Sequence, residues 1–177
     1  VTRDKVVTTQ AVDALASSLR KPFPFKVLRH PEDVSNALNL GLSPDGRYAL
    51  LSTSEIYYGG SRSKSEFVAW DIDRSARLNL HGWSGYAASF SFSADGRKLL
   101  ITGDRGAALL SFPEGRPLWT RESADAGALD AEGHLAAISE RNRIELWDTK
   151  ATRQVAAFGG FGTRIEHLQF ALGGRLL

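Results

Sequence analysis

The chain has 177 residues, of which 42% are hydrophobic and 24% charged, and its formal net charge is +2 at pH 7. This composition indicates one globular domain and excludes a disordered chain. The small net charge gives no support to a nucleic-acid partner. The absence of cysteine excludes disulfides, thiolate zinc sites and cysteine nucleophiles. No apolar run reaches the roughly 18 residues of a membrane helix, and we expect a cytoplasmic location without a membrane partner.

The first expected element is a short helix within residues 1–22. Its apolar residues follow the helical spacing i, i+3, i+4, i+7: Val12, Leu15, Ala16 and Leu19. Pro22 ends the pattern. The helix either packs on the side of the domain or connects to an upstream domain. The chain also has no methionine, so Val1 is not an ordinary start, and we expect a processed product or a segment of a longer protein.

A glycine turn between apolar stretches recurs through residues 23–177. The turn glycines are Gly46, Gly96, Gly133 and Gly174, and their separations are 50, 37 and 41 residues. An Asp-Gly pair between apolar strands is a strong hairpin signal, because glycine adopts positive φ at little cost. A repeat of about 40–45 residues made of strands is typical of a propeller blade.

Each repeat is expected to form a blade of four antiparallel strands. The blades cover residues 35–80, 86–121, 126–158 and, in part, 164–177. The expected strands are Phe23–Leu28 before the first blade; Ala37–Leu42, Arg47–Thr53, Phe67–Ile72 and Arg77–Leu80 in the first; Ala88–Phe92, Lys98–Thr102, Ala107–Phe112 and Pro117–Arg121 in the second; Gly127–Leu129, Leu135–Ser139, Arg143–Asp148 and Gln154–Phe158 in the third; and Ile165–Phe170 and Arg175–Leu177 in the last.

Two of the third strands end in Trp-Asp, at Trp70-Asp71 and Trp147-Asp148, and each follows a glycine turn. Over residues 25–177 this pattern resembles the WD-repeat family, which implies a β-propeller that binds protein partners. The histidine that the family places near the start of each blade is absent, and Trp83 and Phe161 stand in its place. The family's His-Ser-Asp-Trp hydrogen-bond network is therefore not expected intact, and aromatic packing is expected instead.

The number of repeats limits the architecture. Propellers close with roughly four to eight blades, whereas this chain supplies three blades and part of a fourth. An open arc leaves unpaired strand edges at both ends. We therefore expect an all-β incomplete ring of four-stranded blades with a short N-terminal helix. Missing downstream blades, or a second chain, would complete the propeller.

One insertion distinguishes the first repeat, which is 13 residues longer than the second. The extra residues fall between the second and third strands, at Ser54–Glu66. Tyrosine offers a large contact area at low entropic cost, and aromatic residues with arginine are typical of interface hot spots. The predicted partner-binding residues are Tyr57, Tyr58, Arg62, Lys64, Trp83, Tyr86 and Phe161. The alternative is a tolerated surface loop, with Trp83 and Phe161 buried between blades.

No catalytic motif is complete. The run Gly82–Tyr86 is not G-x-S-x-G, because its second glycine comes one residue early. The four histidines contain no i, i+4 ligand pair. We expect no catalytic residue, cofactor or metal, and a non-catalytic scaffold for protein partners. The alternative is an accessory or sensing propeller domain of a larger enzyme, of the hydrolase type. Nucleic-acid binding would predict a steep salt dependence, which we do not expect.

Overall fold

The computed structural model describes residues 37–53, 57–58, 61–62 and 66–171. The expected helix within residues 1–22 and the expected strands Phe23–Leu28 and Arg175–Leu177 lie outside these residues. Lys64 of the predicted partner site also lies outside them.

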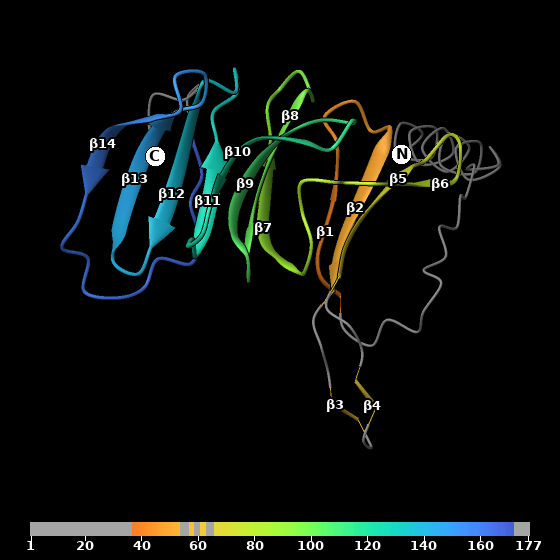
Figure 1. Cartoon of the computed structure of the whole chain (residues 1–177), viewed down its shortest axis with the longest axis horizontal. Helices are drawn as coiled ribbons and strands as arrows, with labels where there is room; N and C mark the ends of the chain where they lie inside the picture. The colour runs from red at the N-terminus through yellow and green to blue at the C-terminus, as the bar shows by residue number, and fades with distance from the viewer. Residues whose placement is uncertain (1–36, 54–56, 59–60, 63–65, 172–177) are drawn as a thin grey trace, which may run out of the picture.

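The described residues form three four-stranded antiparallel sheets, which are the blades, and one two-stranded sheet. Blade 1 contains β1 (Ala37–Leu42), β2 (Tyr48–Thr53), β5 (Glu66–Asp71) and β6 (Ala76–Leu78). Blade 2 contains β7 (Ala87–Phe92), β8 (Lys98–Gly103), β9 (Gly106–Ser111) and β10 (Arg116–Arg121). Blade 3 contains β11 (Ala126–Leu129), β12 (Leu135–Glu140), β13 (Arg143–Asp148) and β14 (Arg153–Phe158). Figure 1 shows the blades side by side along an open arc, so the all-β, incomplete propeller is confirmed.

The recurring turn is built from side chains as well as glycine. In blade 1 the Ser43 hydroxyl donates to Asp45 Oδ1 at 2.5 Å, and the same oxygen accepts the Arg47 amide at 3.1 Å. Gly46 sits at φ +70°, the left-handed region that glycine adopts without a side-chain clash. Ser93 and Asp95 repeat this arrangement in blade 2. The turn motif is therefore a hydrogen-bonded unit that joins the first and second strands.

The core lies in the layers between neighbouring blades. Leu50, Leu99, Ile101 and Leu110 are fully buried where blades 1 and 2 meet. Close approach there requires Gly41, because a Cβ at this position would lie 2.7 Å from the Phe90 ring. A smaller cluster joins blades 2 and 3. Each blade is therefore stabilised mainly by its neighbours.

Hydroxyls on the first two strands of a blade bind the first strand of the next blade. Ser52 Oγ donates to the Ala87 carbonyl at 2.7 Å and accepts the Ala87 amide at 2.9 Å. Thr102 bonds Ser89 Oγ at 2.7 Å, and that oxygen accepts the Gly127 amide at 3.2 Å.

Ser139 continues this series beyond blade 3. Its hydroxyl donates to the Ile165 carbonyl at 3.0 Å, so residue 165 occupies the place of a first strand in a fourth blade. The expected strand Ile165–Phe170 forms no ladder among the described residues. In this stretch the structure has an isolated bridge, at Ala171. A ladder needs a second strand, and the residues expected to form it lie outside the described part.

The insertion contains paired strands. β3 (Tyr57–Tyr58) pairs antiparallel with β4 (Ser61–Arg62), with Tyr57 opposite Arg62. Figure 1 shows this hairpin extending from blade 1, at the end where β2 leads into β5. In the described part of the chain, no helix is long and apolar enough to cross a membrane.

Candidate partner-binding surface

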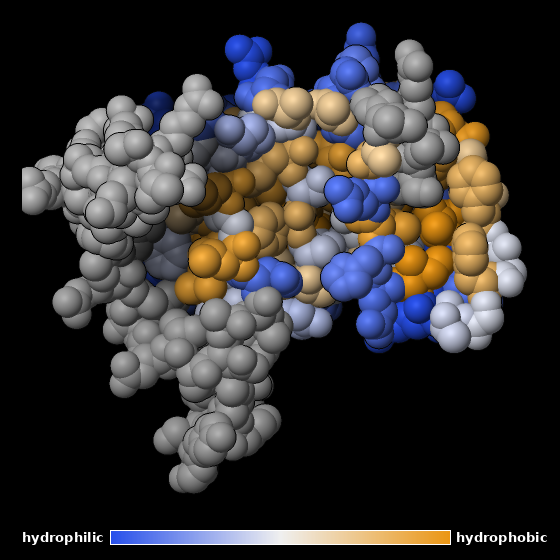
Figure 2. Space-filling model, turned by 180° about the vertical axis from the view of Figure 1, so that it is seen from behind, coloured by the Kyte–Doolittle hydropathy of each residue, from blue (hydrophilic) through white to orange (hydrophobic). Residues whose placement is uncertain are grey.

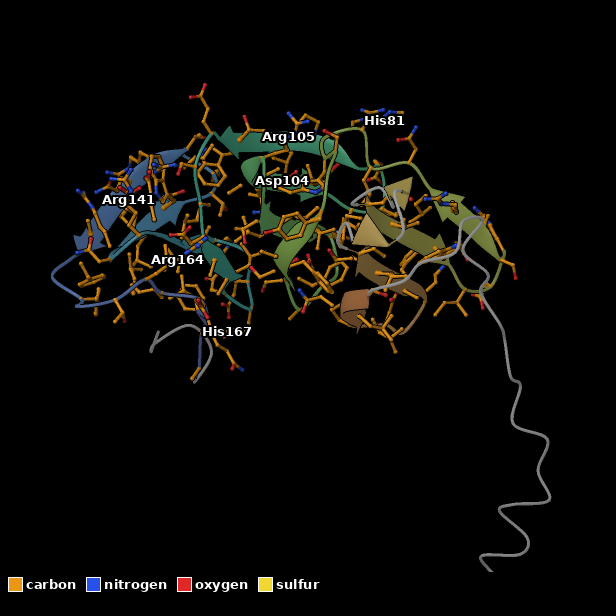
Figure 3. The ribbon with its side chains drawn as sticks, turned by 90° about the horizontal axis from the view of Figure 1, so that it is seen from below. His81, Asp104, Arg105, Arg141, Arg164 and His167 are labelled. Carbon is orange, nitrogen blue, oxygen red and sulfur yellow. The ribbon has the colours of Figure 1, made fainter. Side chains whose placement is uncertain are left out.

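The predicted partner residues belong to connections on one side of the blades. On this side each second strand turns into a third, and each blade leads into the first strand of the next. We call it the loop face. It carries hairpin β3–β4, the end of the connection 79–86, the turns Asp104–Arg105 and Arg141–Asn142, and the segment 159–164. Figure 3 views the molecule from this side.

The connection into blade 2 brings Trp83 and Tyr86 to the base of the insertion. Both side chains are half-buried. The Trp83 ring packs on the core between blades 1 and 2, and its buried Nε1–H donates to no acceptor among the described residues. The Asp104 carboxylate lies against the Gly85 backbone and closes this corner of the loop face. Trp83 is thus partly a core residue, as the alternative interpretation of the sequence held.

A cavity of about 420 Å³ lies beside Trp83, between the outer strands of blade 1 and the connection into blade 2. Phe67, Val68 and Leu78 form its apolar lining. At its rim Arg77 Nη2 pairs with Glu66 Oε1 at 2.6 Å, and Glu66 is the last residue of the insertion.

Phe161 lies apart from this group. It belongs to the segment that follows β14, at the opposite end of the arc from hairpin β3–β4 (Figure 1). Its side chain is 41% exposed, so it is not buried between blades in the described structure. In this open arc the predicted residues therefore form two separate groups, one at blade 1 and one beyond blade 3.

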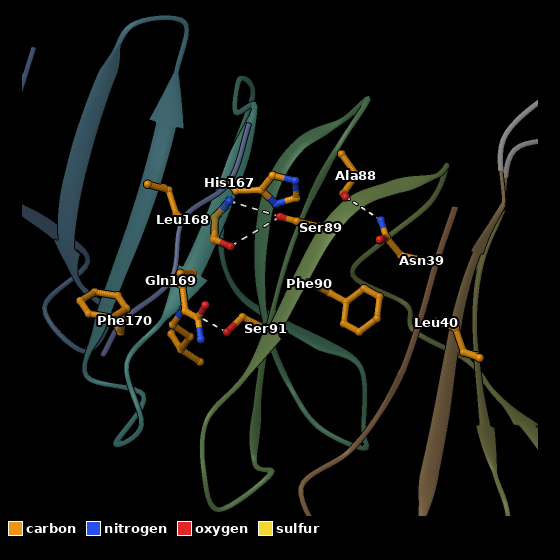
Figure 4. A pocket seen from close by; sticks show the side chains of 13 residues that line it. Asn39, Leu40, Ala88, Ser89, Phe90, Ser91, His167, Leu168, Gln169 and Phe170 are labelled. Carbon is orange, nitrogen blue, oxygen red and sulfur yellow. Dashed lines mark hydrogen bonds between the residues drawn. The ribbon is translucent and has the colours of Figure 1, made fainter. Parts of the chain in front are cut away.

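The concave side holds a cleft of about 500 Å³ between the innermost strands and residues 167–170. Figure 4 shows Asn39, Ser89 and Ser91 of this cleft bonded to neighbouring backbone. Asn39 Nδ2 donates to the Ala88 carbonyl at 2.7 Å, and Ser91 Oγ accepts the Leu129 amide at 3.2 Å. These groups hold the innermost strands together. The cleft is therefore better explained as the axial channel of the propeller than as a pocket with groups reserved for a ligand.

Several carboxyl groups of the described residues have lowered pKa values. The carboxyl groups with displaced pKa values belong to aspartates in turns. The Ser43 hydroxyl and the Arg47 amide lower the pKa of Asp45, and the Arg74 amide, followed by the Arg47 guanidinium, lowers the pKa of Asp71. Such shifts keep structural carboxylates charged. Among the described residues, no group of three or more His, Asp or Glu side chains is placed to hold a metal ion.

A charged cluster joins blades 2 and 3. Arg121 pairs with Glu145 and lies over the Trp147 ring, 4.9 Å from its centroid. Glu145 Oε2 also accepts the Trp147 Nε1–H at 3.0 Å, and the Trp147 ring packs on Trp119 with centroids 5.5 Å apart. The aromatic packing expected from the sequence concerned Trp83 and Phe161, neither of which belongs to this cluster. The charged partners were not expected, because they meet only when the blades pack.

A further loop-face cavity was missed by the sequence reading. It has a volume of about 360 Å³ and is lined by Asp125, Arg141, Asn142, Gly162, Thr163 and Arg164. Arg164 Nη2 pairs with Asp125 Oδ1 at 2.6 Å, across 39 positions of sequence. The Arg141 amide binds the other oxygen of Asp125. No sequence motif marks these residues. The one signal is that Asp125 and Arg164 are separated by 39 residues, which is about the length of one blade.

Comparisons with known proteins agree on the fold. No protein-family model and no curated protein sequence matches this chain. Among solved structures, the WD40 repeats of RRP9 match with a TM-score of 0.59 at 13% identity, over 78% of this chain and 42% of that chain. U3-55K matches with a TM-score of 0.58 at 13% sequence identity, over 78% of this chain and 43% of that chain. Hydrazine synthase of Kuenenia stuttgartiensis matches with a TM-score of 0.55 at 12% sequence identity, over 82% of this chain and 40% of that chain.

These likenesses show the fold and nothing finer. The resemblance to WD-repeat propellers is confirmed, and the chain has the structure of a partial propeller of this type. It spans about two-fifths of the chains that it matches.

Proposed function

We propose that this chain is a non-catalytic scaffold that holds protein partners on its loop face, in the cytoplasm and without nucleic acid. The observation that carries the proposal is hairpin β3–β4, which extends from blade 1 beside the Trp83 cavity. Tyr57, Tyr58 and Arg62 of the hairpin have the residue types of interface hot spots, and Lys64 would add positive charge. Trp83 and Tyr86 extend the same surface toward blade 2.

We also propose that further blades, downstream in the same protein or on a second chain, complete the ring. Both ends of the arc support this. Gly41 faces blade 2, so alternation along β1 turns Leu40 and Leu42 away from it, and they are 75% and 60% exposed. On blade 3, Ile144 and Phe158 are opposite each other, and Phe158 is 48% exposed. Figure 2 shows apolar surface at both ends.

A second candidate function is an accessory or sensing propeller domain of a larger enzyme. The match to hydrazine synthase, which is an enzyme by its name, favours this candidate. The two candidates differ in what completes the protein. An intact mass of the natural protein well above 19.3 kDa, with only further blades in the added sequence, supports the scaffold. Added sequence that folds as a hydrolase domain supports the enzyme.

The scaffold is tested by changing the hairpin. A photo-crosslinking amino acid at position 61, opposite Tyr58 in the hairpin, should trap a defined partner, identified by mass spectrometry. Capture should fall in the double variant Tyr57→Ser, Tyr58→Ser. The matched control is Val155→Ser, which removes a 43% exposed apolar side chain from the outermost strand of blade 3. Unchanged capture by the double variant would reject the hairpin as the partner site.

A further inference from the structure

The loop-face cavity at blade 3 is rich in hydrogen-bond donors. We call it the Arg141 cavity, lined by the six residues given above. Arg141 and Arg164 bring guanidinium groups, which Figure 3 shows in the same part of the molecule. Asn142 and Thr163 add an amide and a hydroxyl, neither of which has a hydrogen-bond partner among the described residues. Four side chains that can donate therefore line one hollow.

The acceptor in this cavity is already engaged. Asp125 Oδ1 binds Arg164 at 2.6 Å, and Oδ2 binds the backbone amide of Arg141. The Arg141 guanidinium itself has no carboxylate within ion-pair distance in the part of the chain that the structure describes. Two other acids of blade 3 have partners of their own, since Glu140 pairs with Arg121 and Glu145 with Arg121 and Arg143.

The same contacts hold the cavity in shape. Asp125 ties the segment that carries Arg164 to the turn that carries Arg141. The Ile165 amide donates to the Arg141 carbonyl at 3.1 Å, so the two sides of the cavity are also joined through backbone. A donor-rich site that is already shaped before binding loses little entropy when it receives an anion.

We propose that the Arg141 cavity binds a carboxylate from an acidic segment of a protein partner, a proposal that rests on the scaffold function. Two arginines and one aspartate leave a net charge of +1, which one carboxylate neutralises. Guanidinium and carboxylate also match in geometry. A phosphate dianion would leave excess negative charge beside Asp125. Phe161, just before the cavity and 41% exposed, suits an apolar residue next to the acid.

The test is a titration of the ¹⁵N-labelled full chain with blocked peptides, followed by NMR. The probes are acetyl-Leu-Glu-Leu-Glu-Leu-amide, the same peptide with glutamine in place of glutamate, and inorganic phosphate. The glutamate peptide should shift the amide signals of Asn142 and Thr163, and the glutamine peptide should not. Arg141→Gln should weaken binding of the glutamate peptide by about fivefold.

Arg105→Gln is the matched control. Arg105 is exposed in the corresponding turn of blade 2 and lines none of the cavities described above, so its loss should leave the affinity unchanged. Equal binding of both peptides, or equal losses in the two variants, would overturn the proposal. Tighter binding of phosphate than of the glutamate peptide would overturn the assignment to a carboxylate.

The peptide titration needs no natural partner. Failure of peptide binding with intact crosslinking at position 61 would therefore remove only the carboxylate site. Loss of crosslinking with intact peptide binding would leave that site standing and remove the hairpin.

Discussion

Replacing Ser52 by alanine removes an oxygen that joins blades 1 and 2 at a fully buried position. The hydroxyl donates to the Ala87 carbonyl at 2.7 Å and accepts the Ala87 amide at 2.9 Å, and both residues are 0% exposed. Alanine leaves two buried backbone groups without this partner. Each such group costs about 1–3 kcal/mol. Because the two losses share one site, we expect the free energy of unfolding to fall by about 2–4 kcal/mol in total.

The assay is urea unfolding followed by tryptophan fluorescence, with thermal melting as a second measurement. The expected loss corresponds to a melting temperature lower by roughly 4–16 °C for a chain of this size. Ser123→Ala is the control, because Ser123 is exposed and its change should stay within about 0.5 kcal/mol.

Ser52→Thr separates the hydrogen bonds from the side-chain volume. Thr102 occupies the corresponding place in blade 2 and bonds through its hydroxyl, so threonine should lose less stability than alanine. A loss below about 1 kcal/mol for Ser52→Ala, or an equal loss for Ser52→Thr, would refute the role given to the hydroxyl.

Two other predictions concern the turns. Thr152 has φ +53° in the turn between the third and fourth strands of blade 3, where blade 2 has Gly115. In urea unfolding, Thr152→Gly should raise the free energy of unfolding by about 0.5–1 kcal/mol, whereas Gly115→Ser should lower it. A loss of stability in Thr152→Gly would contradict this account. The pKa of Asp95 is lowered, chiefly by the Ser93 hydroxyl. Its stabilising effect is therefore complete above the ordinary pKa of about 3.9 and is lost as pH falls through the lower folded-state value. Asp95→Asn should flatten the dependence of unfolding free energy on pH below about pH 4, and an unchanged slope would count against the hydrogen-bonded turn.

The arc also explains why its ends differ from its interior. The layers between blades bury leucine, isoleucine and phenylalanine side chains against one another. At β1 and β14 the same alternation of side chains leaves apolar groups without a neighbouring blade, and Leu40 and Phe158 are exposed as a result. Apolar surface of this kind is typical of an interface, which is why further blades are part of the proposed function.

Local chemistry was enough to predict the blades. Asp45-Gly46 and Asp95-Gly96 mark their turns because the required φ and the hydrogen bonds of the aspartate involve residues only a few positions away. Strand alternation and the Trp-Asp endings are likewise patterns among residues of a single blade. The sequence alone therefore determined the fold class, the number of complete blades and the bounds of most strands to within about two residues. The paired residues of the insertion escaped notice because each strand is only two residues long.

Tertiary structure decided every feature that two blades share. Ser52 and Ala87 are 35 residues apart, and Asp125 and Arg164 are 39 apart. Whether a serine is exposed or bonded to the next blade depends on packing that leaves no local pattern. The same holds for Phe161, whose distance from the hairpin depends on how far the arc extends around the axis. Turns follow from neighbours in sequence, whereas binding surfaces follow from neighbours in space.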